Sequence, residues 1–276
     1  MADNIHHVSG IFYILAFIAM FYMAYNLRRL FTVNIGRPEE YRPLNFSAQI
    51  YNALSFGVGQ KKVFSKRFTY ASIMHFFMGW GFLELLFATT VDFFTARGWL
   101  LEYLPEFDTP WFAFINDTGG AMLITGCIMA LVRRHGNKPE RLPQNNFKGR
   151  GSFLGDSGIL FFLIFLGVGG FITEAARLGI QQPETAHYSW VGYTISKMGS
   201  LEFWVAVHDT AWWSHAIASL LFISILPMTK MFHAIAVVAN VALTNREKRG
   251  LLRPMHVTKM MEDPEADIEN MSLGAS

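Results

Sequence analysis

Five long apolar stretches constrain this chain more than any other feature of its sequence. They cover residues 8–27, 68–94, 111–132, 153–178 and 203–243. Each is long enough to cross a bilayer core of roughly 30 Å, which takes about 20 helical residues. Because a chain in lipid must satisfy its backbone hydrogen bonds internally, such stretches predict helices. We therefore expect an all-α integral membrane protein built as a bundle of five transmembrane helices.

The composition agrees with a membrane protein and excludes several kinds of chemistry. With 52% hydrophobic and 16% charged residues, the chain is too apolar for disorder and too poor in charge for a soluble globule of its size. Its net charge of +2 gives no basic field that would favour nucleic acid. The single cysteine, Cys127, excludes an internal disulfide and an iron–sulfur cluster held by this chain alone.

Lysine and arginine are sorted between the two sides of the predicted bundle. Residues 28–67 hold eight, residues 133–150 hold six, and residues 230–276 hold six more. Arg97, Arg177 and Lys197 are left for the other side. By the positive-inside rule, the N-terminus is outside and the C-terminus is cytoplasmic, which is the parity that five spans require. The protein is expected in the inner or cytoplasmic membrane as a multi-pass chain.

Two segments of the chain are predicted to lie outside the bundle. Residues 1–245 form the membrane domain, and residues 246–276 form a polar, acidic cytoplasmic tail that is a candidate docking arm. Before the second span, apolar residues at near-helical spacing over residues 46–58 precede Lys61 and Lys62. This pattern is typical of a helix lying on the inner leaflet, and the alternative is a docking surface for a soluble subunit.

Four histidines fall within predicted spans, where an ionisable side chain is costly and is a candidate functional group. They are His75, His208, His215 and His233. Eighteen residues make five helical turns, so on one continuous helix His215 and His233 share a face about 27 Å apart. They then lie in opposite leaflets and cannot bind one iron together.

His75 and His233 are predicted to lie at comparable depth on antiparallel spans. Each stands near the basic side, so the pair is suited to be the axial ligands of a haem b. Gly79, one turn beyond His75, and the pairs Gly119–Gly120 and Gly169–Gly170 would leave room for a flat porphyrin, or would serve helix packing. The alternative for any single histidine is a hydrogen-bonded packing residue.

His215 is a candidate ligand for a possible second haem. Its natural partner position, ten residues after His75, is Leu85. A second haem would therefore need an unusual ligand such as Met122 or His208, or no second haem is bound.

The histidine pattern resembles the gamma subunit of respiratory nitrate reductase, a five-span dihaem cytochrome b. In that family two histidines 18 residues apart flank a Pro-x-Ser/Thr-Lys/Arg-x-x-His ending, which residues 215–233 match. Residues 73–75 are similar to the inner-side ligand of the family's second helix, and residues 119–134 to its third. Leu85 departs from the family, whose second helix carries another histidine there, so the outer haem does not carry over.

The end of the fourth span, residues 170–178, is instead similar to membrane cytochromes that accompany heterodisulfide-reductase-like iron–sulfur proteins. These include the sulfite-reductase-associated membrane complex and the electron-transfer-flavoprotein:menaquinone oxidoreductases. The resemblance implies a cytoplasmic iron–sulfur partner and menaquinone as the bound quinone. In fused members, a stretch like residues 252–255 leads into the iron–sulfur domain. Here that domain is either a separate subunit or absent from a truncated sequence.

These observations predict electron transfer between a cytoplasmic iron–sulfur oxidoreductase subunit and the membrane quinone pool. Quinone chemistry also needs groups that exchange protons, and the candidates are Glu174 with Arg177, His208 with Asp209, His215 and Glu84. Glu174 and Arg177, at i and i+3, could simply pair with each other. Glu84 lies two and a half turns from His75 and so points away from the haem face.

Two other functions remain open from the sequence. A haem-free membrane anchor of a redox complex would keep the five spans and the basic side but would show no cytochrome absorption. A small transporter would use Glu84, Glu174 and Arg177 as a substrate or ion path. No sequence repeat or matched pair of broken helices favours a transporter.

Overall fold

The computed structural model describes residues 10–33, 46–61, 63–64, 66–95, 103–106, 108–136 and 155–243. The chain divides into one unit of residues 1–242 and another of residues 243–276. The predicted docking arm, residues 246–276, lies outside the described residues, as does most of the basic loop predicted at 133–150.

Every regular element in the described part of the chain is helical. The α-helices are α1 (Gly10–Val33), α2 (Phe46–Asn52), α3 (Thr69–Thr95), α4 (Pro110–His135), α5 (Gly155–Gln181), α6 (Trp190–Ser196), α7 (Leu201–Ile225) and α8 (His233–Leu243). A π-helical turn at Ala53–Val58 continues α2, and short 3-10 turns stand at Lys66–Phe68, Glu184–Tyr188, Leu226–Met228 and Lys230–Phe232.

Five of the described helices are long and apolar enough to cross a membrane. The segments are Gly10–Arg28, Thr69–Thr95, Pro110–His135, Ser157–Gln181 and Leu201–Met228. The prediction of five long apolar helices is therefore confirmed. Arg67 precedes α3, and Arg133 and Arg134 end α4. We call this end of the helices the basic end, and the end where α4 begins the opposite end.

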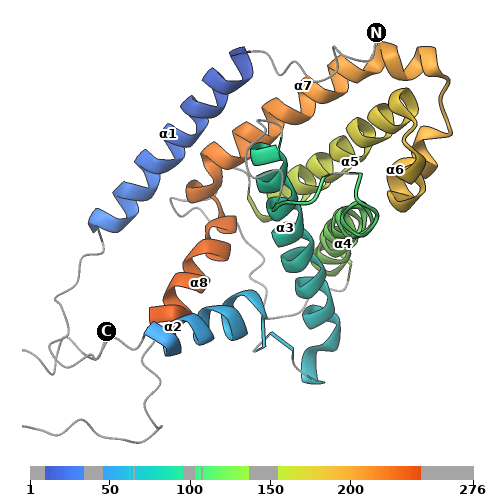
Figure 1. Cartoon of the computed structure of the whole chain (residues 1–276). Helices are drawn as coiled ribbons and strands as arrows, with labels where there is room; N and C mark the ends of the chain where they lie inside the picture. The colour runs from blue at the N-terminus through green and yellow to red at the C-terminus, as the bar shows by residue number, and fades with distance from the viewer. Residues whose placement is uncertain are drawn as a thin grey trace, which may run out of the picture. The chain divides into compact units, whose positions relative to one another are not determined.

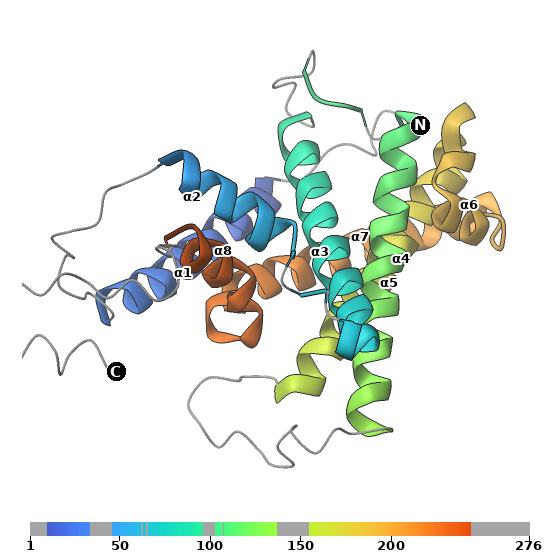
Figure 2. The same ribbon diagram turned by 90° about the horizontal axis from the view of Figure 1, so that it is seen from below.

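Helices α3, α4, α5 and α7 pack in succession, and α1 lies along α7 (Figures 1 and 2). Helices α3 and α4 approach each other closely because small residues stand between them. A Cβ atom at Gly81 would lie 2.6 Å from the Gly119 carbonyl oxygen, and one at Gly126 would lie 2.7 Å from the Met78 backbone nitrogen. Close backbone contact at small residues is typical of membrane helices, which associate mainly by van der Waals packing because the surrounding lipid is as apolar as their side chains.

The main buried cluster lies where α3, α4, α5 and α7 meet. Its members are Leu123, Cys127, Ile159, Leu163, Phe222 and Leu226, with Phe82 and Leu85 packed against them. Many large apolar side chains of the long helices are exposed, for example Phe17 and Phe21 of α1 at 73% and 67%. Exposed apolar side chains along helices of this length are suited to contact with lipid.

The last apolar stretch is two helices and not the single helix that the sequence predicted over residues 203–243. Helix α7 ends at Ile225, and two 3-10 turns with an extended Thr229 between them (φ −109°, ψ 167°) lead to α8. Pro227 lacks the amide hydrogen that a continuous helix needs, and its ring clashes with the preceding turn. Helix α8 turns away from α7 (Figures 1 and 2). His215 and His233 therefore lie on different helices, and the prediction that they share one helix face is wrong.

Candidate functional site

The structure brings His75 and His233 together at the basic end. His75 lies in the second turn of α3, and His233 is the first residue of α8, just after the break at Pro227. Their ring centres are 6.2 Å apart, with the ring planes inclined by 59°. The helix break matters here because it starts α8, and with it His233, in a new direction. His75 is half-buried and His233 is exposed.

The Nδ1 atom of each ring has an oxygen partner. His75 Nδ1 lies 3.2 Å from Gln60 Oε1, and His233 Nδ1 lies 2.5 Å from the backbone carbonyl oxygen of Lys230. Both of these oxygens only accept hydrogen bonds. In the neutral form of either ring, such a partner favours the proton on Nδ1 and leaves Nε2 as the nitrogen with a free lone pair.

The ring separation suits two ligands of one metal ion. A ring nitrogen lies about 1.2 Å from the centre of its imidazole and binds a transition metal at about 2.0 Å, so imidazoles on opposite sides of one ion have centres about 6.4 Å apart. The separation of 6.2 Å is close to this value. The donor set, two imidazoles from different helices, is one that haem iron accepts.

Gln60 is a member of this site that the sequence analysis missed. Its side chain is buried, with 6% exposed, between the exposed residues Gly59 and Lys61. A Cβ atom at Gly79 would overlap Gln60 Nε2. The space at Gly79, which the sequence analysis offered to a porphyrin, is therefore taken by the Gln60 amide. A polar residue ending an amphipathic segment just before Lys61 was the available signal, but nothing in the sequence linked it to His75.

His215 occupies a separate place, in the middle of α7 against α5. A Cβ atom at Gly169 would lie 3.2 Å from its Nδ1, and one at Gly170 would lie 3.4 Å from its Cε1. This glycine pair thus accommodates the imidazole itself. The expected partner position, Leu85, packs against the apolar cluster. Among the described residues, His215 Nδ1 is one of two buried side-chain polar atoms without a hydrogen-bond partner.

The other such atom is Glu84 Oε1, in the middle of α3. The Glu84 carboxylate packs against the backbone of Gly119 in α4, where a Cβ atom would lie 2.7 Å from Glu84 Cδ. Glu84 thus faces α4.

The candidate quinone residues Glu174 and Arg177 pair with each other at the opposite end. Arg177 donates from Nη2 and Nε to the Glu174 carboxylate at 2.9 and 3.2 Å, and from Nη1 to Asp108 at 2.8 Å. Ser189 donates to Glu174 Oε1 at 3.2 Å. The network therefore joins α5 to the segment before α4 and to the segment before α6.

Asp117 is a second residue that the sequence analysis missed. It is 2% exposed, and its Oδ2 accepts from the backbone N–H groups of Val191 and Gly192 at 2.6 and 3.0 Å. The N-cap residue of α6, Ser189, makes no side-chain cap hydrogen bond of its own. Asp117 therefore caps α6 from α4. An acidic residue inside a predicted span was the signal that could have found it.

His208 forms an adjacent pair with Asp209 in α7. The Nδ1 atom of His208 lies 2.9 Å from Asp209 Oδ1, and the side chains are 13% and 92% exposed. The pair that the sequence suggested is present, on a helix different from that of Glu174 and Arg177.

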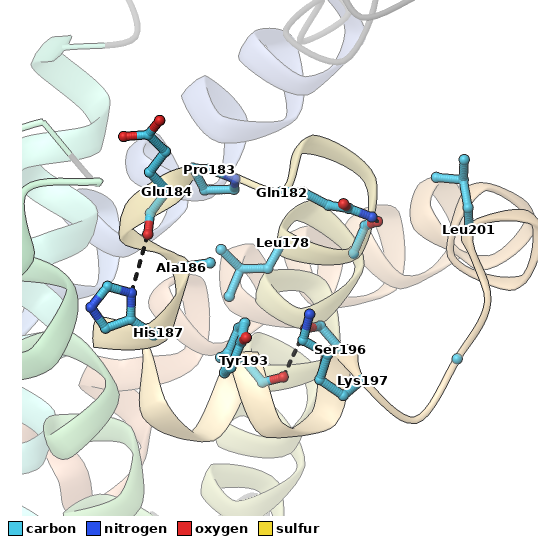
Figure 3. Close-up of a pocket in the computed structure, with 12 residues that line it drawn as sticks. Leu178, Gln182, Pro183, Glu184, Ala186, His187, Tyr193, Ser196, Lys197 and Leu201 are labelled. Atoms are coloured by element: carbon cyan, nitrogen blue, oxygen red, sulfur yellow. Dashed lines mark hydrogen bonds between the residues drawn. The ribbon is translucent and has the colours of Figure 1, made fainter.

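A cavity of about 330 Å³ lies between the C-terminal end of α5, the 3-10 turn at Glu184–Tyr188 and α6 (Figure 3). Leu178, Gln182, His187, Tyr193 and Lys197 are among its lining residues. Two hydrogen bonds, from His187 to the Glu184 carbonyl and from Ser196 to the Tyr193 carbonyl, fix its walls. Glu174, Arg177 and His208 are not among the residues that line it.

Two curated proteins are similar in sequence to this chain. The protein named EtfAB:quinone oxidoreductase from Syntrophomonas wolfei is 24% identical over 228 residues, which are 77% of this chain and 30% of that protein. The probable iron-sulfur-binding oxidoreductase FadF from Bacillus subtilis is 26% identical over 253 residues, 90% of this chain and 34% of that protein. This chain thus spans about a third of the length of these relatives. No family model and no solved structure matches.

Proposed function

We propose that this chain is the haem-b-binding membrane part of a quinone-linked oxidoreductase. One haem b is held by His75 and His233, and electrons pass between an iron–sulfur partner and the quinone pool. The observation that carries the proposal is the pair of rings 6.2 Å apart, each with its Nδ1 beside an oxygen. When bound, haem b supplies one-electron transfer between its ferric and ferrous states.

The sidedness of the proposal follows from the basic residues. The basic end faces the cytoplasm and the N-terminus faces outside, in the cytoplasmic membrane. His75 and His233 then stand near the cytoplasmic side, where an iron–sulfur partner can approach closely. Exposed apolar side chains of the segment 46–58, such as Phe46 and Leu54, lie on this side for contact with lipid or with that partner.

The similarity to two oxidoreductases supports the proposal that this chain exchanges electrons with an iron–sulfur centre and with a quinone. The names of these relatives include a quinone in one case and iron–sulfur binding in the other. This chain covers about a third of each relative, and its single cysteine cannot hold a cluster. The iron–sulfur centre of the proposed complex therefore belongs to another part of it.

The quinone, proposed to be menaquinone, exchanges two electrons and two protons when it is converted to or from the quinol. Glu174 and His208 are proposed to hold and release these protons at the Glu174 carboxylate and at Nε2 of His208. Arg177 holds the Glu174 carboxylate in place through two hydrogen bonds.

A difference spectrum tests the proposal. The purified chain in nanodiscs is expected to show the α-band of a cytochrome b after reduction by dithionite. A menaquinol analogue is expected to reduce the same band, and more slowly in Glu174→Gln. A chain that folds but shows no α-band would reject the proposed function and leave a haem-free anchor. Unchanged quinol kinetics in Glu174→Gln would reject the role of that residue.

A further inference from the structure

We infer that Gln60 is a positioning residue for His75, the proposed cofactor ligand. Gln60 follows α2 and its π-helical turn, outside the membrane-spanning helices. The inference rests on the proposed function, since it assigns a role toward the haem site. Gln60 Oε1 lies 3.2 Å from His75 Nδ1, and the Gln60 side chain is buried although its neighbours are exposed. An amide oxygen can only accept, so His75 donates from Nδ1 and Nε2 is left to bind iron.

The backbone around Gln60 is built to deliver this side chain. Gln60 has φ of 50°, in the left-handed region that residues other than glycine rarely adopt. Hydrogen bonds hold the turn on both sides: Gly59 N donates to the Leu54 carbonyl at 2.7 Å, and Val63 N donates to the Gln60 carbonyl at 2.8 Å. A costly conformation that its surroundings maintain is typical of a residue with a positional role.

Gly79 supplies the space that the Gln60 amide needs. A Cβ atom at Gly79 would overlap Gln60 Nε2 and come within 3.1 Å of Gln60 Cδ. Gly79 stands one turn after His75 on α3, so the amide fits against the same helix that carries the ligand. Three features, the left-handed turn, the buried amide and the missing side chain at Gly79, therefore serve one hydrogen bond.

The two ligands differ in how their hydrogen bonds are made. The partner of His233 is the backbone carbonyl of Lys230, which no side-chain substitution removes, whereas the partner of His75 is a side chain. An acceptor on Nδ1 makes an imidazole a stronger electron donor to iron, which stabilises the ferric state. Loss of the Gln60 acceptor should therefore raise the midpoint potential of the haem.

The test compares variants that remove the acceptor by independent routes. Gln60→Met keeps a side chain of similar length but removes the amide oxygen that accepts the hydrogen bond. Gly79→Ala keeps residue Gln60 but pushes its side-chain amide away from His75. Gln60→Glu keeps an oxygen acceptor in either protonation state. Gln182→Asn is the matched control, because Gln182 also has positive φ (47°) and lies at the other end of the bundle. The full-length chain is used throughout.

Two readouts are taken. In the haem-loaded chain, redox titration is expected to give a more positive midpoint potential in Gln60→Met and Gly79→Ala, with about tenfold weaker haem retention. Gln60→Glu should stay at or below the wild-type potential, and Gln182→Asn should match the wild type. The second readout is the ¹⁵N spectrum of the haem-free chain labelled with ¹⁵N-histidine. In Gln60→Met, the His75 signal should move from the Nδ1-protonated tautomer toward a mixture of both tautomers. In Gln60→Glu and Gln182→Asn, it should stay where it is in the wild type.

The outcomes separate this inference from the proposed function. If the wild type binds no haem, the proposed function fails whatever the Gln60 variants do. If haem binds through His75 and His233 but neither Gln60→Met nor Gly79→Ala changes the potential or the His75 tautomer, the inference is wrong and the proposed function stands. Equal shifts in Gln60→Met and Gln60→Glu would also overturn it, because they would indicate a packing role alone.

Discussion

The carboxylate of Glu84 occupies the space that the absent side chain of Gly119 leaves on the neighbouring helix. A Cβ atom at Gly119 would lie 2.7 Å from Glu84 Cδ, and Glu84 Oε1 is buried without a described partner. Two helices thus meet at a glycine and a long acidic side chain in the middle of the span. The fit requires both residues, so their substitutions should not be additive.

Gly119→Ala is expected to destabilise the protein by roughly 1–3 kcal/mol, because the new methyl group forces the Glu84 carboxylate to move in a packed interface. Glu84→Ala in the same chain should recover most of this loss. Thermal unfolding in detergent micelles measures both. Gly10→Ala is the control, since nothing lies within 4 Å of a Cβ atom there. If the double variant Gly119→Ala with Glu84→Ala is as unstable as Gly119→Ala alone, the two residues do not pack against each other in this way.

Asp117→Ala should loosen α6, because it leaves the N–H groups of Val191 and Gly192 without their acceptor. Hydrogen bonds to a charged group contribute about 1.5–3 kcal/mol each, and the loss should approach that of both together. Asp117→Asn keeps an oxygen at the same place and should lose less. Hydrogen exchange at residues 190–196 measures the effect, and equal protection in Asp117→Ala and wild type would disprove the capping role.

Arg177→Met is expected to cost roughly 3–5 kcal/mol, the usual effect of removing one partner from a buried ion pair. The Arg177 and Glu174 side chains are only 18% and 15% exposed, so little water can replace the lost partner. Asp108 is 43% exposed, so Asp108→Asn should cost about 1 kcal/mol or less. The double variant Glu174→Gln with Arg177→Met should be more stable than Arg177→Met alone. Chemical unfolding curves compare the three, and equal losses for Arg177→Met and Asp108→Asn would count against the pairing.

Thr229 should control the position of His233. Its hydroxyl accepts from Met231 N at 3.2 Å and donates to the Leu226 carbonyl at 2.9 Å, between the two turns that replace a continuous helix. Thr229→Ala is expected to lose about 1 kcal/mol of stability, as for other lost helix caps, and to weaken haem retention. Thr229→Ser keeps the hydroxyl and should behave as the wild type. Haem loss to apomyoglobin measures retention, and identical rates in Ala and Ser variants would argue against this role.

The sequence predicted the long helices well because hydrophobic length is a local property. The span predicted at residues 68–94 is the helix Thr69–Thr95, and that at 111–132 lies within Pro110–His135. The break before His233 was missed although Pro227 stands there, because the apolar run continues through it to Leu243. Because some membrane helices continue through a proline, the sequence alone did not decide whether the helix breaks at Pro227.

The proximity of His75 and His233 could be predicted because it depends on how deep each residue lies in the predicted bundle. Comparing their distances from the basic residues selected two histidines whose ring centres are 6.2 Å apart in the structure. Gln60 and Asp117 were missed for another reason. Each acts through a residue distant in the sequence, His75 or Gly192, and such contacts depend on tertiary packing that periodicity does not encode.

The haem content of purified chains tests the central claim most directly. The wild type, His135→Ala and His215→Ala are expected to bind about one haem b per chain, whereas His75→Ala and His233→Ala each lose it, because one imidazole does not form a six-coordinate site. His135 is the matched control, since it stands at the basic end and contacts Ser157. If His75→Ala and His233→Ala fold and retain haem at the wild-type ratio, the two residues are not its ligands and the account is wrong.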